Sequence, residues 1–464
     1  MQMRSRTSSM SSTDSEPLFR VYWTRWIVLL SVVLVNFSNA MTWITYAPIT
    51  YHTQDFYKNS NAALFLNGIF LVVSIPVGIF TMYIMDKWGL KPSILIGAGF
   101  NLVGNLLRVV SAIDSIDTNI RFALVMSGQT LAAIAQPFIM YLPTKMSAYW
   151  FPESQRAFSN TLASMSNPLG IAVMYALSPQ IVTNTHPTAF LTLNGAVAAI
   201  AVVTAVVACL VPGSKPPTPV SIASENKIEP LAFLAGVKRC GTSKSFIVLS
   251  IILGGAIGLF NTLYNNLQPA LCVRGYSATF SGIMGATLIV SGLVGAAISG
   301  IFVDRTKKFQ ETMKFCFFLT GFAASSLTVA INFFDVQWWI AISIASFGVL
   351  GFAIYPIGLE VGVEITFPVA EATSTGIICI MGQIEGIIFL LVTAAFNQQP
   401  SPDQMKVQTC MVTDKPSDVP DWKYSFIAWT VIIYIQIVIF STTFWPRYKR
   451  SEYEASESRK LQAS

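Results

Sequence analysis

Two groups of polar and aromatic residues recur at helical spacing inside long apolar segments of the chain. They are Asn36, Asn39, Trp43 and Tyr46 in the first segment and Asn261, Tyr264, Asn265 and Gln268 in a later one. Each group falls on one stripe of an α-helix. Polar groups in an apolar helix are costly unless they face protein or a cavity. The stripes therefore indicate either the wall of a polar cavity or hydrogen bonding between helices.

Two further apolar segments carry isolated polar side chains. Gln129 and Gln136 are seven residues apart and share one helix face. Gln383 and Glu385 are separated by about 200° on a helix, so they cannot both face one cavity. An acid in such a segment is a candidate for carrying a coupled proton or binding a cation. Glu385 could equally accept hydrogen bonds from a neighbouring helix.

Three acids are concentrated in the segment 358–376, which contains no Lys or Arg. We expect this segment to be a loop that holds Glu360, Glu364 and Glu371. These carboxylates would either pair with basic residues of adjoining loops, and so latch one side of the molecule, or belong to a solvated turn.

A short acidic and basic motif occurs twice. Asp86 begins it in MDKWGLKP and Asp304 begins it in VDRTKKFQ. The same sequence separation relates Trp43 to Asn261, one residue from each polar stripe. The chain is therefore predicted to contain two structural repeats, and Asp86 is a candidate gating residue.

The elements that carry these residues are twelve apolar segments, each long enough to cross the hydrocarbon core of a bilayer, which takes about 20 residues. They are 26–50, 62–85, 93–113, 122–144, 157–182, 188–211, 246–269, 279–303, 315–334, 337–359, 372–397 and 425–446. Hydrophobic residues make up 53% and charged residues 11% of the chain, whereas soluble domains have about 25% charged residues. We predict an all-α membrane protein with twelve transmembrane helices. This excludes most enzymes and nucleic-acid partners and makes the lipid bilayer the surroundings of the chain.

The basic residues lie mainly on one side of the predicted membrane. The other side carries only Lys58, Arg121, Arg274, Lys406, Lys415 and Lys423, and Arg108 lies within a segment. Because Lys and Arg are enriched in cytoplasmic loops, both termini are predicted to be cytosolic.

The segments divide the chain into two halves. A disordered cytosolic segment, 1–25, precedes the first half, 26–211. The second half, 245–446, follows a flexible cytosolic linker at 212–244, and the chain closes with a cytosolic tail at 447–464. The widest gap between apolar segments contains SKPPTP, whose composition is typical of a linker.

No bound group is predicted. The two histidines and six cysteines lack the spacing of metal ligands, and no nucleotide-binding glycine motif is present, so we expect neither a metal nor a cofactor. Cys272 and Cys410 fall in predicted outer loops, where a disulfide could form, although both could also stay free.

Several long motifs resemble those of a known family. NFSNAMTWITYAPI, GQTLAAIAQPFIMYLPTKMSAYWFPESQRA, LCVRGYS and MGQIEGI are similar to the feline leukaemia virus subgroup C receptor-related transporters, solute carrier family 49, and most of all to the third member type of that family. The repeated acidic motif resembles the loop signature of the major facilitator superfamily. The resemblance implies that superfamily's fold, with two six-helix halves around a central site.

The resemblance also implies which residues bind a solute. Relatives are linked to choline and ethanolamine uptake, haem export or pyridoxine transport, and their tryptophan and two glutamines match Trp43, Gln136 and Gln383. Asn261 stands where the choline-binding relatives carry a tyrosine, and Glu385 where they carry an apolar residue. From the stripe on the later helix, Asn261 and Tyr264 are expected across the cavity from Trp43.

These features together predict a secondary or facilitative transporter that moves a small organic solute by alternating access. The solute would be a cationic or polar metabolite related to choline, ethanolamine, pyridoxine or haem. The alternative is a membrane receptor or scaffold that keeps the fold without transporting. The sequence favours the plasma membrane, but DSEPLF at 14–19 resembles an acidic dileucine signal for endolysosomal sorting. It leaves the oligomeric state open.

Overall fold

The structure is a computed structural model that describes residues 20–59, 61–220, 232–407, 409, 411–412, 415–416 and 420–463. The predicted sorting signal at 14–19 and Cys410 lie outside the described residues.

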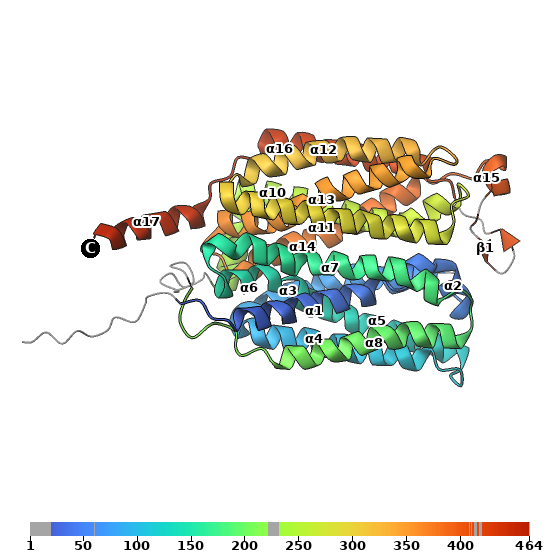
Figure 1. Ribbon diagram of the computed structural model, residues 1–464, viewed down its shortest axis with the longest axis horizontal. Helices are drawn as coiled ribbons and strands as arrows, with labels where there is room; N and C mark the ends of the chain where they lie inside the picture. The colour runs from blue at the N-terminus through green and yellow to red at the C-terminus, as the bar shows by residue number, and fades with distance from the viewer. Residues whose placement is uncertain are drawn as a thin grey trace, which may run out of the picture.

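Two sets of six long helices form the two halves of the described chain. The first set is α1 (Arg25–Ile44), α3 (Ala62–Trp88), α4 (Leu90–Ser111), α5 (Thr118–Met140), α7 (Glu153–Ile181) and α8 (Pro187–Cys209). The second set is α10 (Lys244–Cys272), α11 (Ala278–Thr306), α12 (Phe309–Ala330), α13 (Gln337–Thr366), α14 (Glu371–Ala395) and α16 (Lys423–Thr443). The first set occupies the lower half of Figure 1 and the second set the upper half. The predicted all-α membrane fold is confirmed.

Shorter elements connect or follow these helices. They are η1 (Ala47–Ile49), α2 (Thr50–Phe56), α6 (Leu142–Trp150), α9 (Phe233–Thr242), α15 (Pro402–Val407), α17 (Lys449–Ala463) and the antiparallel strands β1 (Met411–Val412) and β2 (Lys415–Pro416). The start of α1 and all of α17 lie at the same end of the bundle, at the left of Figure 1. We call this end the terminal face. The strands and α15 lie at the opposite end.

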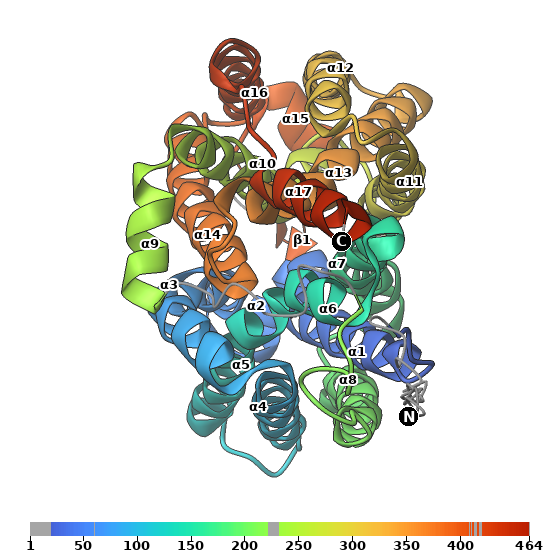
Figure 2. The ribbon, with the colours of Figure 1, turned by 90° about the vertical axis from the view of Figure 1, so that its left-hand side faces the viewer.

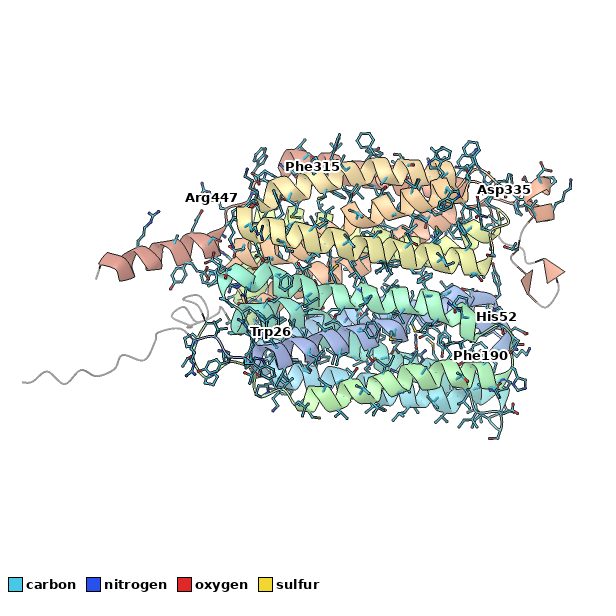
Figure 3. The ribbon with its side chains drawn as sticks, viewed as in Figure 1. Trp26, His52, Phe190, Phe315, Asp335 and Arg447 are labelled. Atoms are coloured by element: carbon cyan, nitrogen blue, oxygen red, sulfur yellow. The ribbon has the colours of Figure 1, made fainter. Side chains whose placement is uncertain are left out.

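The outer surface of the bundle is apolar over most of its length. On α12, Phe315, Phe318 and Phe322 are 65%, 52% and 55% exposed, and Figure 3 shows Phe315 projecting away from the bundle. Large exposed apolar side chains at helical spacing suit lipid contact and not water. Eleven described helices are long and apolar enough to cross a membrane. The twelfth long helix, α7, is less apolar because it is rich in Ser and Asn.

Two expectations about the connecting segments need correction. The predicted linker 212–244 contains the helix α9. Glu360 and Glu364 are not in a loop, because α13 continues to Thr366, and Glu371 is the first residue of α14. Glu360 and Glu364 mark the end of the apolar run but not the end of the helix. The helix α13 ends before Phe367, because the residue preceding a proline disfavours helical geometry. The predicted tail, 447–464, contains α17.

The two halves make close contact where α7 packs against α11. A Cβ atom on Gly282 would lie 2.7 Å from the carbonyl oxygen of Tyr175, and one on Gly285 would lie 2.7 Å from the Tyr175 ring. Only glycine lets the helices approach this closely. At the end opposite the terminal face, Cys272 is disulfide-bonded. Its pairing with Cys410 stays a prediction.

Candidate functional site

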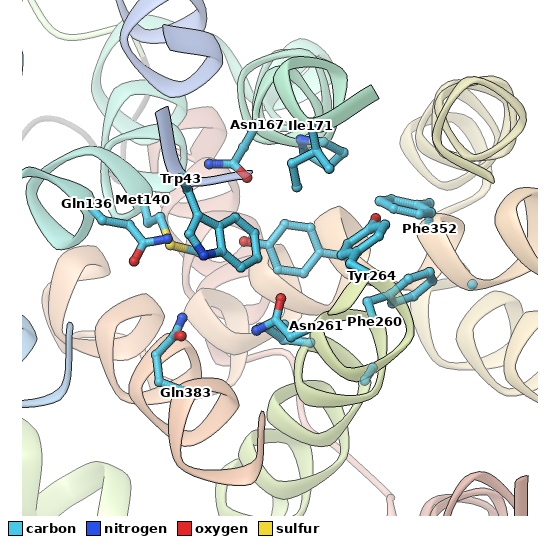
Figure 4. Close-up of a pocket in the computed structure, with 15 residues that line it drawn as sticks. Trp43, Gln136, Met140, Asn167, Ile171, Phe260, Asn261, Tyr264, Phe352 and Gln383 are labelled. Atoms are coloured by element: carbon cyan, nitrogen blue, oxygen red, sulfur yellow. The ribbon is translucent and has the colours of Figure 1, made fainter. Parts of the chain in front are cut away.

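A central cavity lies between the halves, with α1, α5 and α7 on one side and α10, α13 and α14 on the other. Its volume is about 80 Å³. The lining residues are Trp43, Gln136, Met140, Asn167, Pro168, Ile171, Ala256, Ile257, Phe260, Asn261, Tyr264, Gly351, Phe352, Tyr355 and Gln383. The five residues that we expected to bind a solute are all among them, and Figure 4 shows their side chains around one space. None of the described lining residues carries a formal charge.

Trp43 lies among the other lining side chains (Figure 4), one residue before the end of α1. Its indole nitrogen donates to the carbonyl oxygen of Asn67 at 3.2 Å, which fixes the ring within the cavity. The helix stops at Ile44, so the carbonyl groups of its last turn need other donors. The Gln129 amide supplies them, with hydrogen bonds to the carbonyl oxygens of Thr42 at 3.2 Å and Trp43 at 3.3 Å. Gln129 thus supports the tryptophan from outside the cavity.

The two cavity glutamines differ in how firmly they are held. The Gln136 oxygen accepts a hydrogen bond of 2.6 Å from the Ser74 hydroxyl, and its amide nitrogen points toward Trp43 (Figure 4). Gln383 lies on α14 beside Asn261 (Figure 4). Its amide oxygen is buried and has no hydrogen-bond partner among the described residues.

Three buried polar atoms of the cavity lack a partner within the described chain. They are the Gln383 oxygen, the Tyr264 hydroxyl and the Asn167 amide nitrogen. Buried polar groups are nearly always hydrogen-bonded in native proteins, because an unpaired one costs about 1–3 kcal/mol. The cavity therefore suits a ligand that donates a hydrogen bond to the Gln383 oxygen, accepts one from the Asn167 amide and does either with the Tyr264 hydroxyl. Asn167 was missed by the sequence analysis, although it is an amide directly before Pro168 in an apolar segment.

Aromatic rings form the side of the cavity facing α13. Phe260 lies 4.5 Å from Phe352 and 6.2 Å from Tyr264, measured between ring centroids. The Tyr175 hydroxyl donates to the Tyr264 carbonyl oxygen, so a residue of the first half contacts the helix that carries Asn261 and Tyr264. The wall is therefore apolar toward α13 and polar toward α14.

The other residues of the two predicted stripes do not line the cavity. Asn36 donates to the Ile139 carbonyl at 3.3 Å, and Asn39 donates to the Ala132 carbonyl at 2.9 Å. The Tyr46 hydroxyl donates to Asn194 at 2.9 Å. On α10, Asn265 bonds to the carbonyl of Asn261 in its own helix. For these four residues the interhelical or local hydrogen-bonding interpretation holds. Of the two stripes, only Trp43, Asn261 and Tyr264 line the cavity.

Arg108 lies within the first half, fully buried, and its partners are neutral. Its guanidinium donates to the Tyr46 hydroxyl (3.3 Å), the Thr42 carbonyl (3.3 Å), Asn105 (3.0 Å) and Asn194 (3.5 Å). The charge also lies 4.9 Å from the centre of the Tyr46 ring, a cation–π distance. We call these five residues the Arg108 network. It joins α1, α4 and α8 next to the end of α1.

Glu385 faces away from the cavity, as its angle to Gln383 requires. The residue is 8% exposed, and one carboxylate oxygen has no partner among the described residues. A Cβ atom on Gly255 of α10 would lie 2.6 Å from the Glu385 carboxylate. The same atom would lie 1.7 Å from the amide of Gln436 on α16. Glu385 therefore lies among α10, α14 and α16. Whether it couples a proton or supports these helices stays a prediction.

Hydrogen bonds between the halves close the terminal face. The Asp86 carboxylate lies 3.4 Å from the Lys145 ammonium and accepts a hydrogen bond from Thr373 in the other half. Nearby, the Thr144 and Thr375 hydroxyl groups are 2.8 Å apart and also join the halves. Asp86 thus lies where a change in the separation of the halves would break its contacts.

The three glutamates of 358–376 lie at the same face. Glu360 and Glu364 are each 4% exposed, and Glu364 accepts hydrogen bonds from the Ser451 backbone nitrogen (3.1 Å) and hydroxyl (2.8 Å). Arg156 and Arg450 act on the Glu360 carboxylate electrostatically. Their neighbours therefore include α17, which lies in the predicted cytosolic tail. A latching role for Glu360, Glu364 and Glu371 stays a prediction.

Comparisons with known proteins agree with this architecture. The Major Facilitator Superfamily model matches residues 28–390. Solute carrier family 49 member A3 of Xenopus tropicalis is 34% identical over 95% of this chain and 91% of its own length. Choline/ethanolamine transporter flvcr2a of Danio rerio is 29% identical over 83% of this chain and 82% of its own length. The fold is similar to that of FucP, a transporter of the same superfamily solved in the outward conformation, with a TM-score of 0.61, 14% identity and coverage of 90% of this chain and 100% of that one.

The twelve long helices of the described chain, the central cavity and the family match define a multi-pass membrane protein of the major facilitator superfamily, which is a class of transporters. Within that superfamily, the chain belongs to solute carrier family 49. The family resemblance inferred from the sequence motifs is confirmed.

Proposed function

We propose that this protein transports a small solute with a cationic or strongly polar head group by alternating access, and that the central cavity is its binding site. The observation that carries the proposal is the set of three unpaired polar atoms beside the indole of Trp43. The indole face attracts a cation through its ring quadrupole. The unpaired atoms orient hydroxyl, amine or carbonyl groups of the solute.

The chemistry of the lining narrows the solute class. The Gln383 oxygen needs a hydrogen-bond donor. An ethanolamine-like solute offers ammonium N–H groups and a hydroxyl, and a pyridoxine-like solute offers several hydroxyl groups, whereas choline offers one hydroxyl only, because its quaternary ammonium has no N–H. This favours ethanolamine-like or pyridoxine-like solutes over choline, and Asn261 in place of a ring points the same way. Haem carries carboxylates, which no described lining residue can neutralise. A cavity of about 80 Å³ would also have to enlarge greatly to admit a macrocycle.

Uptake into proteoliposomes tests the proposal. The purified protein should show saturable uptake of ethanolamine or pyridoxine, weaker uptake of choline and no uptake of haem. Saturable haem uptake without uptake of the smaller solutes would refute the solute class.

The tryptophan is tested separately. Removal of a cation–π contact costs about 0.5–2 kcal/mol, so Trp43→Ala should raise the half-saturation concentration from a few-fold to about thirty-fold. Trp338→Ala is the matched control, because Trp338 is 84% exposed at the start of α13, far from the lining residues. Unchanged kinetics in Trp43→Ala at equal protein levels would rule out the proposed site.

A further inference from the structure

The last helix of the chain lies across the junction of the two halves. Figure 2, which looks onto the terminal face, shows α17 crossing from the second half toward α7 of the first half. Its first turns are buried against the bundle, with Arg450 2% and Glu454 7% exposed. Side chains of this kind are rarely buried unless they are paired, so this part of α17 is docked onto the bundle.

Side chains of α17 contact both halves at once. Glu454 lies 3.5 Å from the Arg156 guanidinium on α7 of the first half. Ser451 donates its backbone N–H and its hydroxyl to one oxygen of Glu364, on α13 of the second half. The Tyr453 ring also stacks on Phe367, with 5.3 Å between centroids. The helix therefore connects the halves at the face that Asp86 and Thr144 also close.

The carboxyl groups around this contact disfavour a further anion at Ser451. Four carboxyl groups, Glu371, Glu360, Glu364 and Glu454, act electrostatically on the Arg450 guanidinium, and Glu454 also lies 3.5 Å from that of Arg156. Burial raises the pKa of the Glu454 carboxyl, and the nearby Arg156 and Arg450 oppose that shift. The carboxyl groups outnumber the guanidinium groups around this contact. An additional negative group at Ser451, whose hydroxyl lies 2.8 Å from Glu364, would face a carboxylate directly.

The sequence around Ser451 matches the chemistry that a protein kinase reads. Arg447, Lys449 and Arg450 precede the serine, and kinases select substrates partly by such charge patterns. Ser451 is half-buried while α17 is docked, and its hydroxyl is hydrogen-bonded to Glu364. A kinase would therefore act on the undocked helix, and the phosphate would then prevent its return.

We propose that Ser451 is a phosphorylation site, and that its modification releases α17 and allows the halves to separate at the terminal face. The Ser451 oxygen attacks the γ-phosphorus of ATP, the bond to ADP breaks, and the hydroxyl proton passes to the base of the kinase. The phosphate adds about 1.5 to 2 negative charges beside Glu364, where like-charge repulsion and desolvation disfavour docking. The proposal rests on the proposed alternating access and on the predicted cytosolic position of the termini.

A disulfide cross-link reports the separation of the halves without any substrate. Thr144→Cys and Thr375→Cys replace hydroxyl groups that are 2.8 Å apart across the junction, and oxidation should join them in the otherwise unchanged chain. Adding Ser451→Glu should lower the rate of cross-linking several-fold. Ser456→Glu is the matched control on an exposed position of the same helix and should leave the rate unchanged.

A second measurement covers the case in which the glutamate imitates phosphate poorly. The purified cysteine-pair protein is treated with a basic-directed kinase and ATP, and the modified site is identified by mass spectrometry. Phosphate on Ser451 together with slower cross-linking supports the proposal. Absence of phosphate on Ser451, or cross-linking that is unchanged or faster after both treatments, overturns it. Since no solute is involved, these results are independent of the uptake experiments.

Discussion

The central cavity and the Arg108 network both place polar side chains deep in the bundle, but they satisfy them differently. In the network, Arg108 makes four hydrogen bonds to neighbouring residues. In the cavity, Gln383, Tyr264 and Asn167 each leave a buried polar atom without a partner in the described chain. Groups paired within the protein stabilise the fold, whereas unpaired groups around one space are available to a ligand. Single unpaired oxygens also occur outside the cavity, on Asn39 and Gln129. The candidate binding site is therefore marked by several unpaired atoms that line one shared space.

The largest expected effect concerns the buried guanidinium. Arg108→Leu leaves Asn105, Asn194 and the Thr42 carbonyl without their charged donor, and hydrogen bonds to charged groups contribute about 1.5–3 kcal/mol each. The variant should lose most of its thermal stability and yield, as measured by melting of the detergent-purified protein. Arg305→Leu, at an exposed position of α11, should melt like the parent protein. Equal melting of both variants would show that the network does not support the fold.

A pair of glutamine substitutions tests the comparison more finely. Gln129→Leu removes the donor to the carbonyls of Thr42 and Trp43, so it should lower stability by about 1–3 kcal/mol. Gln383→Leu removes an unpaired oxygen, so stability should hold while the half-saturation concentration rises several-fold. Melting and uptake are measured for both. The assignment of the two glutamines is wrong if Gln383→Leu melts lower than Gln129→Leu and transports normally.

The smallest effects should come from two matched tyrosines, each losing one hydroxyl. Tyr46→Phe loses bonds to Asn194 and Arg108 and should cost about 1 kcal/mol of stability with little change in uptake. Tyr264→Phe removes a hydroxyl that has no partner within the described chain, so it should weaken uptake and leave melting unchanged. Melting and uptake are measured for both variants. Lower stability in Tyr264→Phe together with weaker uptake in Tyr46→Phe would reject the distinction between supporting and binding tyrosines.

The sequence by itself determined the positions of the long helices and that a lipid bilayer surrounds them. Apolar length and the 3.6-residue period are local properties, so each of the twelve predicted segments overlaps a long helix of the described chain. The family motifs gave the correct superfamily. Trp43, Gln136 and Gln383 could be named because they match motifs of the family. Asn261 and Tyr264 could be named because a polar stripe on the helix equivalent to the first must face something other than lipid.

Only the tertiary structure decided what each polar residue faces, because that depends on the neighbouring helix. Asn39 and Trp43 share one stripe, yet Asn39 is paired with another helix and Trp43 lines the cavity. Asn167 lines the cavity because α7 lies opposite α10. The local sequence pattern around Asn167 does not predict which helix faces it. Glu364 lies in the helix α13 and not in the predicted loop. The sequence places this charge at the edge of an apolar run, and only the packing of α17 against α13 shows that it is buried.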